Sequence, residues 1–295
     1  MSNKCIIQIQ HLSKQYQQNK VFENLNLEIK SGITLVTGKN GAGKSTLLKM
    51  IIGLEEPTYG EITIFDNIKS KALSKKDKLK IGFQFQNDSF LRGVKVKEYI
   101  NLYHLMYENS DKLYNSNKIS ELLKINELEN KYAVNLSGGQ KKRLSLFLSI
   151  LGERKIIILD EPTAGIDIEL KIMILEVIHY LKSCGVTIIV SSHDVEEFID
   201  VCDELVILNK KVLFNGDKRC FYNLYDYKYK ARIKNGLEEK YIDTCKLAFL
   251  FDSQYIISEE KSTLVQAGFT DIERMSFKDY YAMLMSENGE VNHGN

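Results

Sequence analysis

The sequence predicts an α/β fold built on a doubly wound parallel sheet, and three observations carry that prediction. Residues 33–37, 156–160 and 186–191 are short, nearly uninterrupted apolar runs, which are typical of strands buried on both faces. Between the last two runs, residues 167–183 place apolar side chains at helical spacing and stop before Gly185. Strands that alternate with helices in this way favour parallel β-α-β units covered by helices.

Length, composition and charge limit the classes of protein to consider. The 295 residues suggest one large α/β domain with an appendage, and 44% hydrophobic residues are ample for a core. Lysine and arginine number 40 and aspartate and glutamate 39, so the net charge of +1 gives no electrostatic reason to expect nucleic acid as a partner. No run of about 18 apolar residues occurs, so we expect that the chain does not itself cross a membrane.

The first residues and the cysteines favour a chain that stays in a reducing compartment. Residues 7–10 alternate apolar and polar side chains, which predicts a strand and not a secretion signal. The five cysteines are widely spaced and form no Cys-x-x-Cys pair, so we expect neither a zinc site nor a disulfide framework. Buried or incidental thiols in the cytosol are the simpler interpretation.

A glycine-rich segment follows the first buried strand. Residues 38–46 match G-x-x-x-x-G-K-[ST] between the strand at 33–37 and a helical stretch at 45–52. Glycines let backbone N–H groups turn toward phosphate oxygens, and the helix N-terminus adds its positive dipole end. Lys44 supplies charge for the β and γ phosphates of a nucleoside triphosphate, and the Ser45 hydroxyl can bind Mg²⁺. The candidate binding residues are Gly38, Lys39, Asn40, Gly41, Ala42, Gly43, Lys44, Ser45 and Thr46.

Two carboxylates follow the second buried strand. Asp160 and Glu161 stand at the end of the run at 156–160, where open α/β sheets bind their ligands. Asp160 can hold Mg²⁺ through water, and Glu161 can accept a proton from an attacking water or orient it. Alone, the pair would be an ordinary strand exit with solvated acids. Beside a phosphate loop it predicts a site that brings water and a metal ion to a phosphate.

Residues 87–136 differ from the rest, because their apolar side chains fall at helical spacing and no convincing strand interrupts them. We interpret them as a helical insert in the α/β core. Just before an amphipathic run at 141–151 stands the segment Leu136-Ser137-Gly138-Gly139-Gln140. Ser137 can cap the following helix, and the two glycines expose backbone N–H groups at its start. The segment therefore predicts a second anion-binding site in the same chain.

These motifs, in this order, resemble those of the ATP-binding subunits of ABC transporters, and the resemblance covers about residues 4–217. The phosphate loop resembles the Walker A motif of the family, and residues 136–140 resemble its signature motif. Asp160 and Glu161 stand where the family has the Walker B aspartate and the catalytic glutamate.

Four single residues take their expected roles from this resemblance. Gln86 stands at the Q-loop and is expected to contact the metal ion and water, and His193 looks like the switch histidine that contacts the γ-phosphate. Asp167 ends a segment similar to the D-loop, and Tyr16 stands where the family has an aromatic ring stacked on adenine.

The resemblance also implies a fold and a division of the chain. The expected fold is a P-loop NTPase core with an ABC-type antiparallel β subdomain, an α-helical insert and a small C-terminal extension. The ATPase domain would cover residues 1–217, with its core at 1–86 and 137–217, its helical subdomain at 87–136, and the extension at 218–295.

The implied cofactors are ATP and Mg²⁺, with Ser45, Gln86 and Asp160 at the metal ion. Two ATPase subunits, alike or different, would pair head to tail. Each nucleotide would then also contact residues of the second subunit, namely Ser137, Gly138, Gly139, Gln140 and Asp167.

The expected partner is a separate transmembrane subunit, with the chain bound peripherally at the cytoplasmic face of the cell membrane. Residues 93–100 resemble the segment after the Q-loop in exporters of drugs, peptides or lipids, and residues 276–281 resemble the short terminal helix of such subunits. Ser276 and Asp279 can cap that helix. We therefore favour export over two alternatives, an importer of a vitamin or metal and an ATPase that regulates a partner without transport.

The start of the extension is basic and rich in tyrosine. Six Lys and Arg residues between 218 and 234 face only Asp226, with four tyrosines between them. The simpler interpretation is a solvated connector, and the alternative is contact with anionic lipid or with a cytoplasmic loop of the partner.

Overall fold

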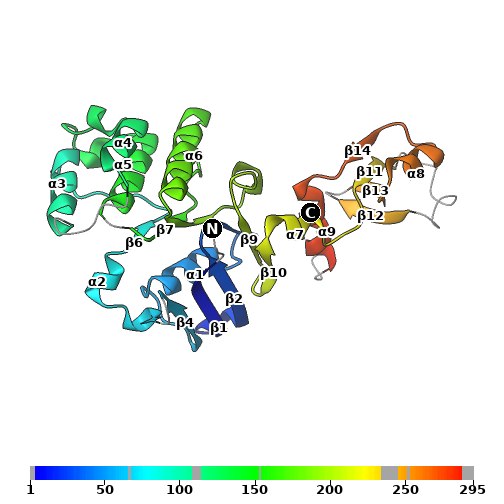
Figure 1. The fold of residues 1–295 in the computed structure, drawn as a ribbon, viewed down its shortest axis with the longest axis horizontal. Coiled ribbons are helices and arrows are strands. Elements are labelled where there is room, and N and C mark those ends of the chain that lie inside the picture. The colour runs from blue at the N-terminus through cyan, green and yellow to red at the C-terminus, as the bar shows by residue number, and fades with distance from the viewer. Residues whose placement is uncertain are drawn as a thin grey trace. The chain divides into compact units, whose positions relative to one another are not determined.

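The computed structural model describes residues 4–65, 68–107, 114–152, 154–233, 245–250 and 253–287. The chain divides into two compact units, Met1–Asp217 and Lys218–Asn295 (Figure 1). Each unit has its own strands, helices and buried side chains.

A six-stranded sheet forms the centre of the first unit. Its strand order is β10-β9-β3-β8-β7-β6, and neighbours from β9 to β6 run parallel. The strands are β3 (Ile33–Thr37), β6 (Ile81–Gln84), β7 (Ile156–Asp160), β8 (Thr187–Ser191), β9 (Glu204–Leu208) and the antiparallel edge strand β10 (Val212–Asp217). Every residue of β3, β7, β8 and β9 is buried, as expected for strands covered on both faces. The prediction of a parallel α/β core is confirmed.

A second sheet in this unit is antiparallel, with strand order β2-β1-β4-β5. Its long hairpin joins β1 (Cys5–Tyr16) to β2 (Asn19–Lys30), and β4 (Tyr59–Ile64) and β5 (Ile68–Lys69) complete it. Apolar side chains at alternate positions face inward, because successive residues of a strand point to opposite faces of a sheet. The strand expected near residues 7–10 is therefore one arm of a larger hairpin.

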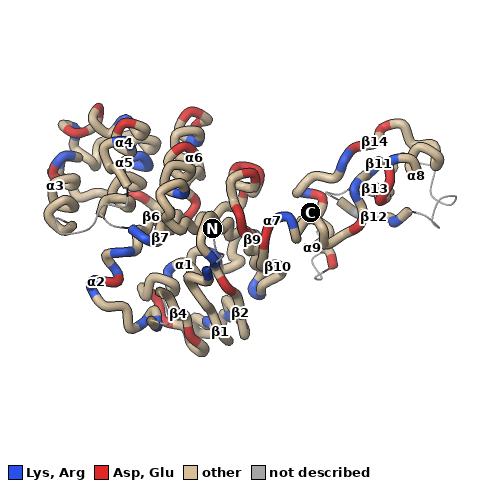
Figure 2. The backbone as a smooth tube through the Cα atoms, viewed as in Figure 1, with Lys and Arg blue, Asp and Glu red and all other residues tan. Residues whose placement is uncertain are grey.

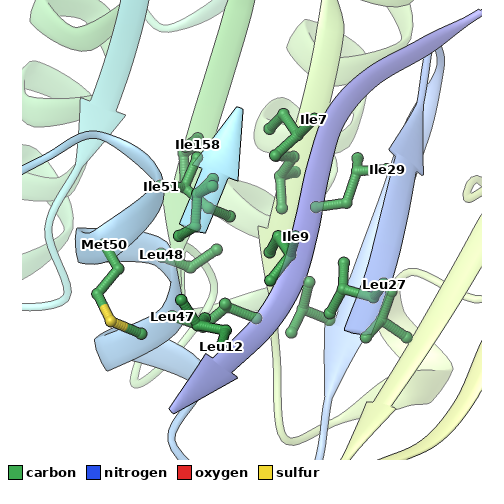
Figure 3. Close-up of a cluster of buried hydrophobic side chains, with 14 of the residues drawn as sticks. Ile7, Ile9, Leu12, Leu27, Ile29, Leu47, Leu48, Met50, Ile51 and Ile158 are labelled. Atoms are coloured by element: carbon green, nitrogen blue, oxygen red, sulfur yellow. The ribbon is translucent and has the colours of Figure 1, made fainter. Parts of the chain in front are cut away.

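The core of the first unit lies between the two sheets and helix α1 (Lys44–Ile51). Figure 3 shows side chains of β1 and β2 directed toward α1, with Ile158 of β7 beside them. The buried set that these elements share includes Ile7, Ile9, Leu12, Leu27, Ile29, Leu47, Leu48, Ile51 and Ile158. This cluster anchors α1, and α1 in turn positions the glycine-rich segment that precedes it.

In the described part of the region 87–136, the regular elements are helices, as expected. It holds α3 (Val96–Met106), α4 (Ser116–Leu122) and two 3-10 turns, Ile125–Glu127 and Ala133–Asn135. These helices gather beside α5 (Gly138–Ile150) and α6 (Ile168–Ser183) (Figure 1). The remaining short elements of this unit are α2 (Lys75–Lys78) and the 3-10 turns Ser70–Ala72 and Val195–Glu197.

Arg143 of α5 attaches the insert to the core. Its guanidinium donates to the Leu123 carbonyl at 2.6 Å and also to the Lys124 carbonyl, and lies 3.5 Å from the Glu127 carboxylate. The insert is thus joined directly to the helix that follows residues 136–140.

The second unit is a small α/β unit around a four-stranded antiparallel sheet of order β12-β13-β11-β14. The strands are β11 (Tyr229–Arg232), β12 (Lys246–Leu250), β13 (Ser253–Ser258) and β14 (Ile272–Arg274), and the helices are α7 (Lys218–Tyr222), α8 (Lys261–Gln266) and α9 (Phe277–Glu287). The expectation of a solvated connector at 218–234 was wrong for the described part of that stretch. Phe221 and Ala231 are buried, and β11 lies between β13 and β14 in the sheet.

The terminal helix predicted around residues 276–281 is present as α9 and is longer than expected. Ser276 donates its N–H and its hydroxyl to Asp279 Oδ2, at 2.7 and 2.8 Å. The carboxylate therefore caps the start of α9, and Lys230 Nζ lies 2.8 Å from its other oxygen. Phe277, Tyr280 and Leu284 are buried on one face of α9.

Basic and acidic residues are interspersed along each unit (Figure 2), in keeping with the net charge of +1. Within the described ranges, no helix has the length and apolar character needed to span a bilayer.

Candidate functional site

The glycine-rich segment forms a tight turn between β3 and α1. Gly43 stands at the N-cap of α1 with φ of 95°, a conformation that favours glycine. A side chain at Gly43 would collide with the ring of Phe22 and with Val21, both on β2. Glycine is therefore required here for the chain to enter α1 at this angle.

The side chain of Lys44 turns back over this segment. Its Nζ donates to the Gly38 carbonyl at 2.8 Å and to the Lys39 carbonyl at 3.3 Å, and lies 3.8 Å from Glu161 Oε1. Burial lowers the pKa of Lys44, while the charges of Glu161 and Asp160 act in the opposite direction. A buried ammonium group surrounded by the turn is suited to binding phosphate.

Ser45, Asp160 and Ser191 form one hydrogen-bonded group. Asp160 Oδ1 accepts from Ser45 Oγ at 3.1 Å and from Ser191 Oγ at 2.6 Å. Asp160 and Ser191 are paired residues at the ends of the adjacent parallel strands β7 and β8. Sequence reasoning assigned no role to Ser191, although its place at the end of a buried strand was a usable signal.

The oxygen donors of this group fit Mg²⁺. Among the described residues, no group of three or more His, Cys, Asp and Glu side chains is placed to hold a metal ion. Mg²⁺ does not need such a cage, because it is commonly bound by one or two protein oxygens together with substrate phosphates and water. The adjoining hydroxyl of Ser45 and carboxylate of Asp160 are such a pair.

Glu161 is held in place from both sides. Its N–H donates to Ser191 Oγ at 2.9 Å and its backbone has φ of 50°, a left-handed conformation uncommon for a residue with a side chain. Glu161 Oε2 lies 2.8 Å from His193 Nδ1. The side chain of Glu161 is 8% exposed and that of His193 is 57% exposed. Glu161 therefore lies on the buried side of the pair and His193 on the solvent side.

Two predicted residues are not joined to this group by any described hydrogen bond. The side chain of Gln86 is exposed, and no hydrogen bond in the described part of the chain joins it to Ser45 or Asp160. The carbonyl of Gln86 accepts from Lys142 Nζ at 3.3 Å. The Tyr16 hydroxyl donates to Glu55, and its ring lies 4.6 Å from Lys14 Nζ. The expected roles of Gln86 at the metal ion and Tyr16 at adenine stay predictions.

The segment 136–140 begins α5 with a reciprocal cap, so the expected cap at Ser137 is confirmed. Ser137 Oγ accepts from the Gln140 N–H at 3.3 Å, and Gln140 Oε1 accepts from the Ser137 N–H at 3.2 Å. Ser137 and Gly138 are exposed. Asp167 caps α6 by accepting from the Leu170 N–H at 2.9 Å. No described hydrogen bond or ion pair joins these two caps to Lys44 or Ser45 of the same chain.

The geometry is typical of a nucleotide-hydrolysing P-loop protein, because a glycine-rich turn with a buried lysine, a carboxylate beside a hydroxyl and a second carboxylate meet at one edge of a parallel sheet. Comparison with known proteins gives the family. The model of the ABC transporter family matches residues 22–164. A putative ABC transporter ATP-binding protein of Methanocaldococcus jannaschii is 31% identical over 278 residues, which cover 90% of this chain and 96% of that protein.

Two further relatives have names that point in opposite directions of transport. The methionine import ATP-binding protein of Clostridium tetani is 33% identical and aligns with 72% of this chain and 69% of its own. The lipoprotein-releasing system ATP-binding protein of Buchnera aphidicola is 34% identical and aligns with 73% of this chain and 99% of its own. A solved dimeric ATP-binding cassette in a post-hydrolysis state with ADP and Pi is 27% identical, with a TM-score of 0.62 over 72% of this chain and 99% of that chain.

This chain belongs to the family of ATP-binding proteins of ABC transporters. It is an ATPase subunit of such a transporter, with the cassette fold of the solved dimer.

Proposed function

We propose that the chain hydrolyses ATP at the site around Lys44, Asp160 and Glu161, and that Glu161 accepts the proton of the attacking water. The observation that carries this proposal is the placement of Glu161, whose carboxylate lies 3.8 Å from Lys44 Nζ and 2.8 Å from His193 Nδ1. A base next to the phosphate-binding lysine is within reach of water aligned with the γ-phosphate. His193, on the exposed side, would contact the γ-phosphate.

Residues 38–46 would bind the triphosphate through backbone N–H groups and the Lys44 ammonium. Ser45 and Asp160 would hold Mg²⁺, with Gln86 as a further contact, and the bound ion would offset the charge that develops on the phosphate oxygens. Tyr16 would stack on adenine. The Ser45–Asp160 hydrogen bond of 3.1 Å supports the metal site, because it brings the two expected oxygen donors together.

The residues around the caps of α5 and α6 would act on the nucleotide of a second ATPase subunit. Ser137 and Gly138 are exposed at the start of α5, where free N–H groups and the helix dipole attract an anion. Within one chain, no described hydrogen bond or ion pair joins them to the phosphate loop. A head-to-tail dimer would bring Ser137, Gly138, Gly139, Gln140 and Asp167 of one subunit to the ATP bound by the other.

The membrane subunit would dock on α3 and on the segment after Gln86. Exposed large apolar side chains are found there at Leu91 (70%), Leu102 (53%), Leu105 (64%) and Met106 (52%). Apolar groups gathered on a surface favour contact with another protein. The chain would thus work at the cytoplasmic face of the membrane, and Gln86 would relate the nucleotide site to the docked subunit.

Export is the direction that we propose, because residues 93–100 and the terminal helix α9 are similar to those of exporter ATPases. The relative named for lipoprotein release is in keeping with this proposal. Import is the second candidate, and the relative named for methionine import favours it.

Purification with mild detergent tests the proposal of a membrane partner. The chain is expected to carry with it a transmembrane protein that changes its ATPase rate in lipid vesicles. Leu105→Glu should abolish this co-purification while ATP binding by the isolated chain is retained, because a charge on α3 would be desolvated in the contact. Val265→Glu is the matched control, since Val265 is a comparably exposed apolar residue (56%) of α8 in the C-terminal unit.

If the wild-type chain purifies without any membrane protein, the proposed membrane partner fails, and an ATPase that regulates a partner without transport replaces it. With the complex in hand, sealed vesicles that expose the ATPase outward separate the two directions. Substrate accumulated inside such vesicles on addition of ATP indicates export, and ATP-driven release of loaded substrate indicates import.

A further inference from the structure

Lys142 is a buried lysine on the helix that begins with residues 136–140. It is 5% exposed, although lysine is seldom buried unless it is paired. Its Nζ donates a hydrogen bond of 3.3 Å to the carbonyl of Gln86, which lies beyond the end of β6. The neighbouring Lys141 is only half-buried. Of these two lysines, it is therefore Lys142 that contacts the segment after β6.

Three carboxylates act on the ammonium group of Lys142. Burial lowers its pKa, and the charges of Asp88, Asp160 and Glu161 oppose that effect. Burial also raises the pKa of Asp88, against which a hydrogen bond from Ser145 and the charge of Lys142 act. The charge of Lys142 therefore interacts both with Asp88, in the segment after Gln86, and with the acidic pair at the nucleotide site.

A second contact joins the same two segments. Gln84, the last residue of β6, is fully buried and donates its side-chain amide to the backbone carbonyl of Lys142 at 3.4 Å. Lys142 thus attaches α5 to the end of β6 twice, through its backbone carbonyl and through its side-chain ammonium group. Ser137 at the N-cap and Lys142 are five positions apart on this helix, which corresponds to about 7.5 Å of rise.

We propose that Lys142 is a positioning residue that transmits contact between Ser137 and the nucleotide of a second subunit to Gln86 of its own chain. The proposal rests on the function proposed above, in which the start of α5 meets the partner's ATP. An α-helix moves as a rigid element over so short a distance, so a shift of Ser137 is passed to Lys142. Because Lys142 holds the Gln86 peptide, Gln86 follows.

The alternative role of Lys142 is simply to neutralise the half-buried Asp88. A lysine with that role alone would not pass a shift of α5 to the Gln86 carbonyl. The two roles are separable, because neutralisation can be restored by removing both charges, whereas transmission needs the hydrogen bond to the Gln86 carbonyl.

Hydrogen exchange in an ATP-trapped dimer tests the proposal. In the full-length Glu161→Gln variant, ATP is expected to slow amide exchange in residues 85–89 as well as in residues 38–46, and size-exclusion chromatography reports the dimer. Adding Lys142→Met should remove most of the slowing at 85–89. The amides there should exchange about tenfold faster or more than in Glu161→Gln alone, since a charged hydrogen bond is lost. The slowing at 38–46 and the dimer should remain.

Three further variants in the same background complete the test. Lys142→Arg keeps a cation and its donors and should retain the slowing at 85–89. Lys141→Met, the matched control one position away, should also retain it. Lys142→Met combined with Asp88→Asn leaves no unpaired buried charge, and should still lack the slowing.

Three outcomes would overturn the proposal: no slowing at 85–89 in the Glu161→Gln dimer, full slowing with Lys142→Met, or recovery in the double variant, which would assign Lys142 to charge neutralisation. If Glu161→Gln never forms an ATP-dependent dimer, the proposed function itself fails and the inference falls with it. Chromatography identifies that case independently of the exchange data.

Discussion

Ser191 Oγ donates a hydrogen bond of 2.6 Å to Asp160 Oδ1 and accepts one of 2.9 Å from the Glu161 N–H. One hydroxyl on β8 therefore holds both adjacent acids at the end of β7. Asp160 is kept beside Ser45, and the backbone of Glu161 is kept in the conformation that turns its carboxylate toward Lys44 and His193.

Replacement of this hydroxyl is expected to lower activity more than stability. Ser191→Ala removes both hydrogen bonds, so kcat should fall about tenfold, the scale of one hydrogen bond worth about 1–1.5 kcal/mol. Steady-state ATPase assays and thermal unfolding measure the two effects. Ser149→Ala is the matched control, because Ser149 is also buried but its hydroxyl donates to the Leu146 carbonyl within α5. Equal loss of activity in both variants would argue against the role of Ser191.

The carboxylate of Glu161 is expected to be the general base. Glu161→Gln should bind ATP normally and lose turnover by about 10² or more, because an amide cannot accept the proton of water. Phosphate release measures turnover, and the variant should accumulate an ATP-bound dimer. Glu169→Gln, on the exposed start of α6, should leave the rate unchanged. Near-normal hydrolysis by Glu161→Gln would refute this assignment.

Lys44 is expected to account for much of the affinity for ATP. Lys44→Ala leaves the phosphate charge uncompensated within the turn, so ATP binding should become undetectable or severely weakened in calorimetry. Lys49→Ala, in the last turn of the same helix, removes an equal charge and should change affinity little. Unchanged affinity in Lys44→Ala would contradict the phosphate site.

The start of α5 is expected to act on the second subunit. Ser137→Arg places a bulky cation at an exposed cap, so ATP binding by the single chain should persist while ATP-dependent dimerisation is lost. A mixture of Ser137→Arg and Lys44→Ala chains can form one intact composite site, and part of the ATPase activity should return.

A mixture as inactive as both parents has two explanations, since either the head-to-tail arrangement is wrong or both sites must be intact. Repeating the mixture with Glu161→Gln in both chains separates them. A dimer trapped by ATP in that background indicates one competent composite site, and absence of the dimer rejects the arrangement.

The C-terminal unit is expected to depend on a buried ion pair. Asp279 is fully buried and lies 2.8 Å from Lys230 Nζ, so Asp279→Ala leaves a half-buried ammonium without this partner. The free energy of unfolding of this unit should fall by about 3–5 kcal/mol, which urea titration followed by tyrosine fluorescence measures. Glu273→Ala is the control, because Glu273 is 70% exposed and lies 3.4 Å from the same Nζ. Equal, small effects of both changes would show that the pair contributes little.

Much of the first unit could be predicted, because its signals lie within short stretches. The apolar runs of β3 and β7 predict strands buried on both faces, and the glycines before Lys44 predict a turn. The spacing of apolar residues predicts α6, and Ser137 predicts the start of α5. In each case the residues that carry the signal also form the structure.

The C-terminal extension was predicted less well, for a physical reason. The charges and tyrosines near residues 218–234 have the composition of a solvated segment, but β11 is completed by β13 and β14, which follow later in the chain. Buried Phe221 meets Phe277 of α9, with ring centroids 4.8 Å apart. A polar stretch can thus lie in a sheet when distant residues supply its partners.

The sequence by itself determined the family, the phosphate turn and the place of Asp160 and Glu161 at the end of a buried strand, since these depend on residue types at fixed local spacing. Only the tertiary structure decided that Ser191 holds Asp160 and that Lys142 holds Gln86. Each of these pairs joins residues that are remote along the chain. Such contacts depend on the register between β7 and β8 and on how α5 packs beside β6, which no local pattern encodes.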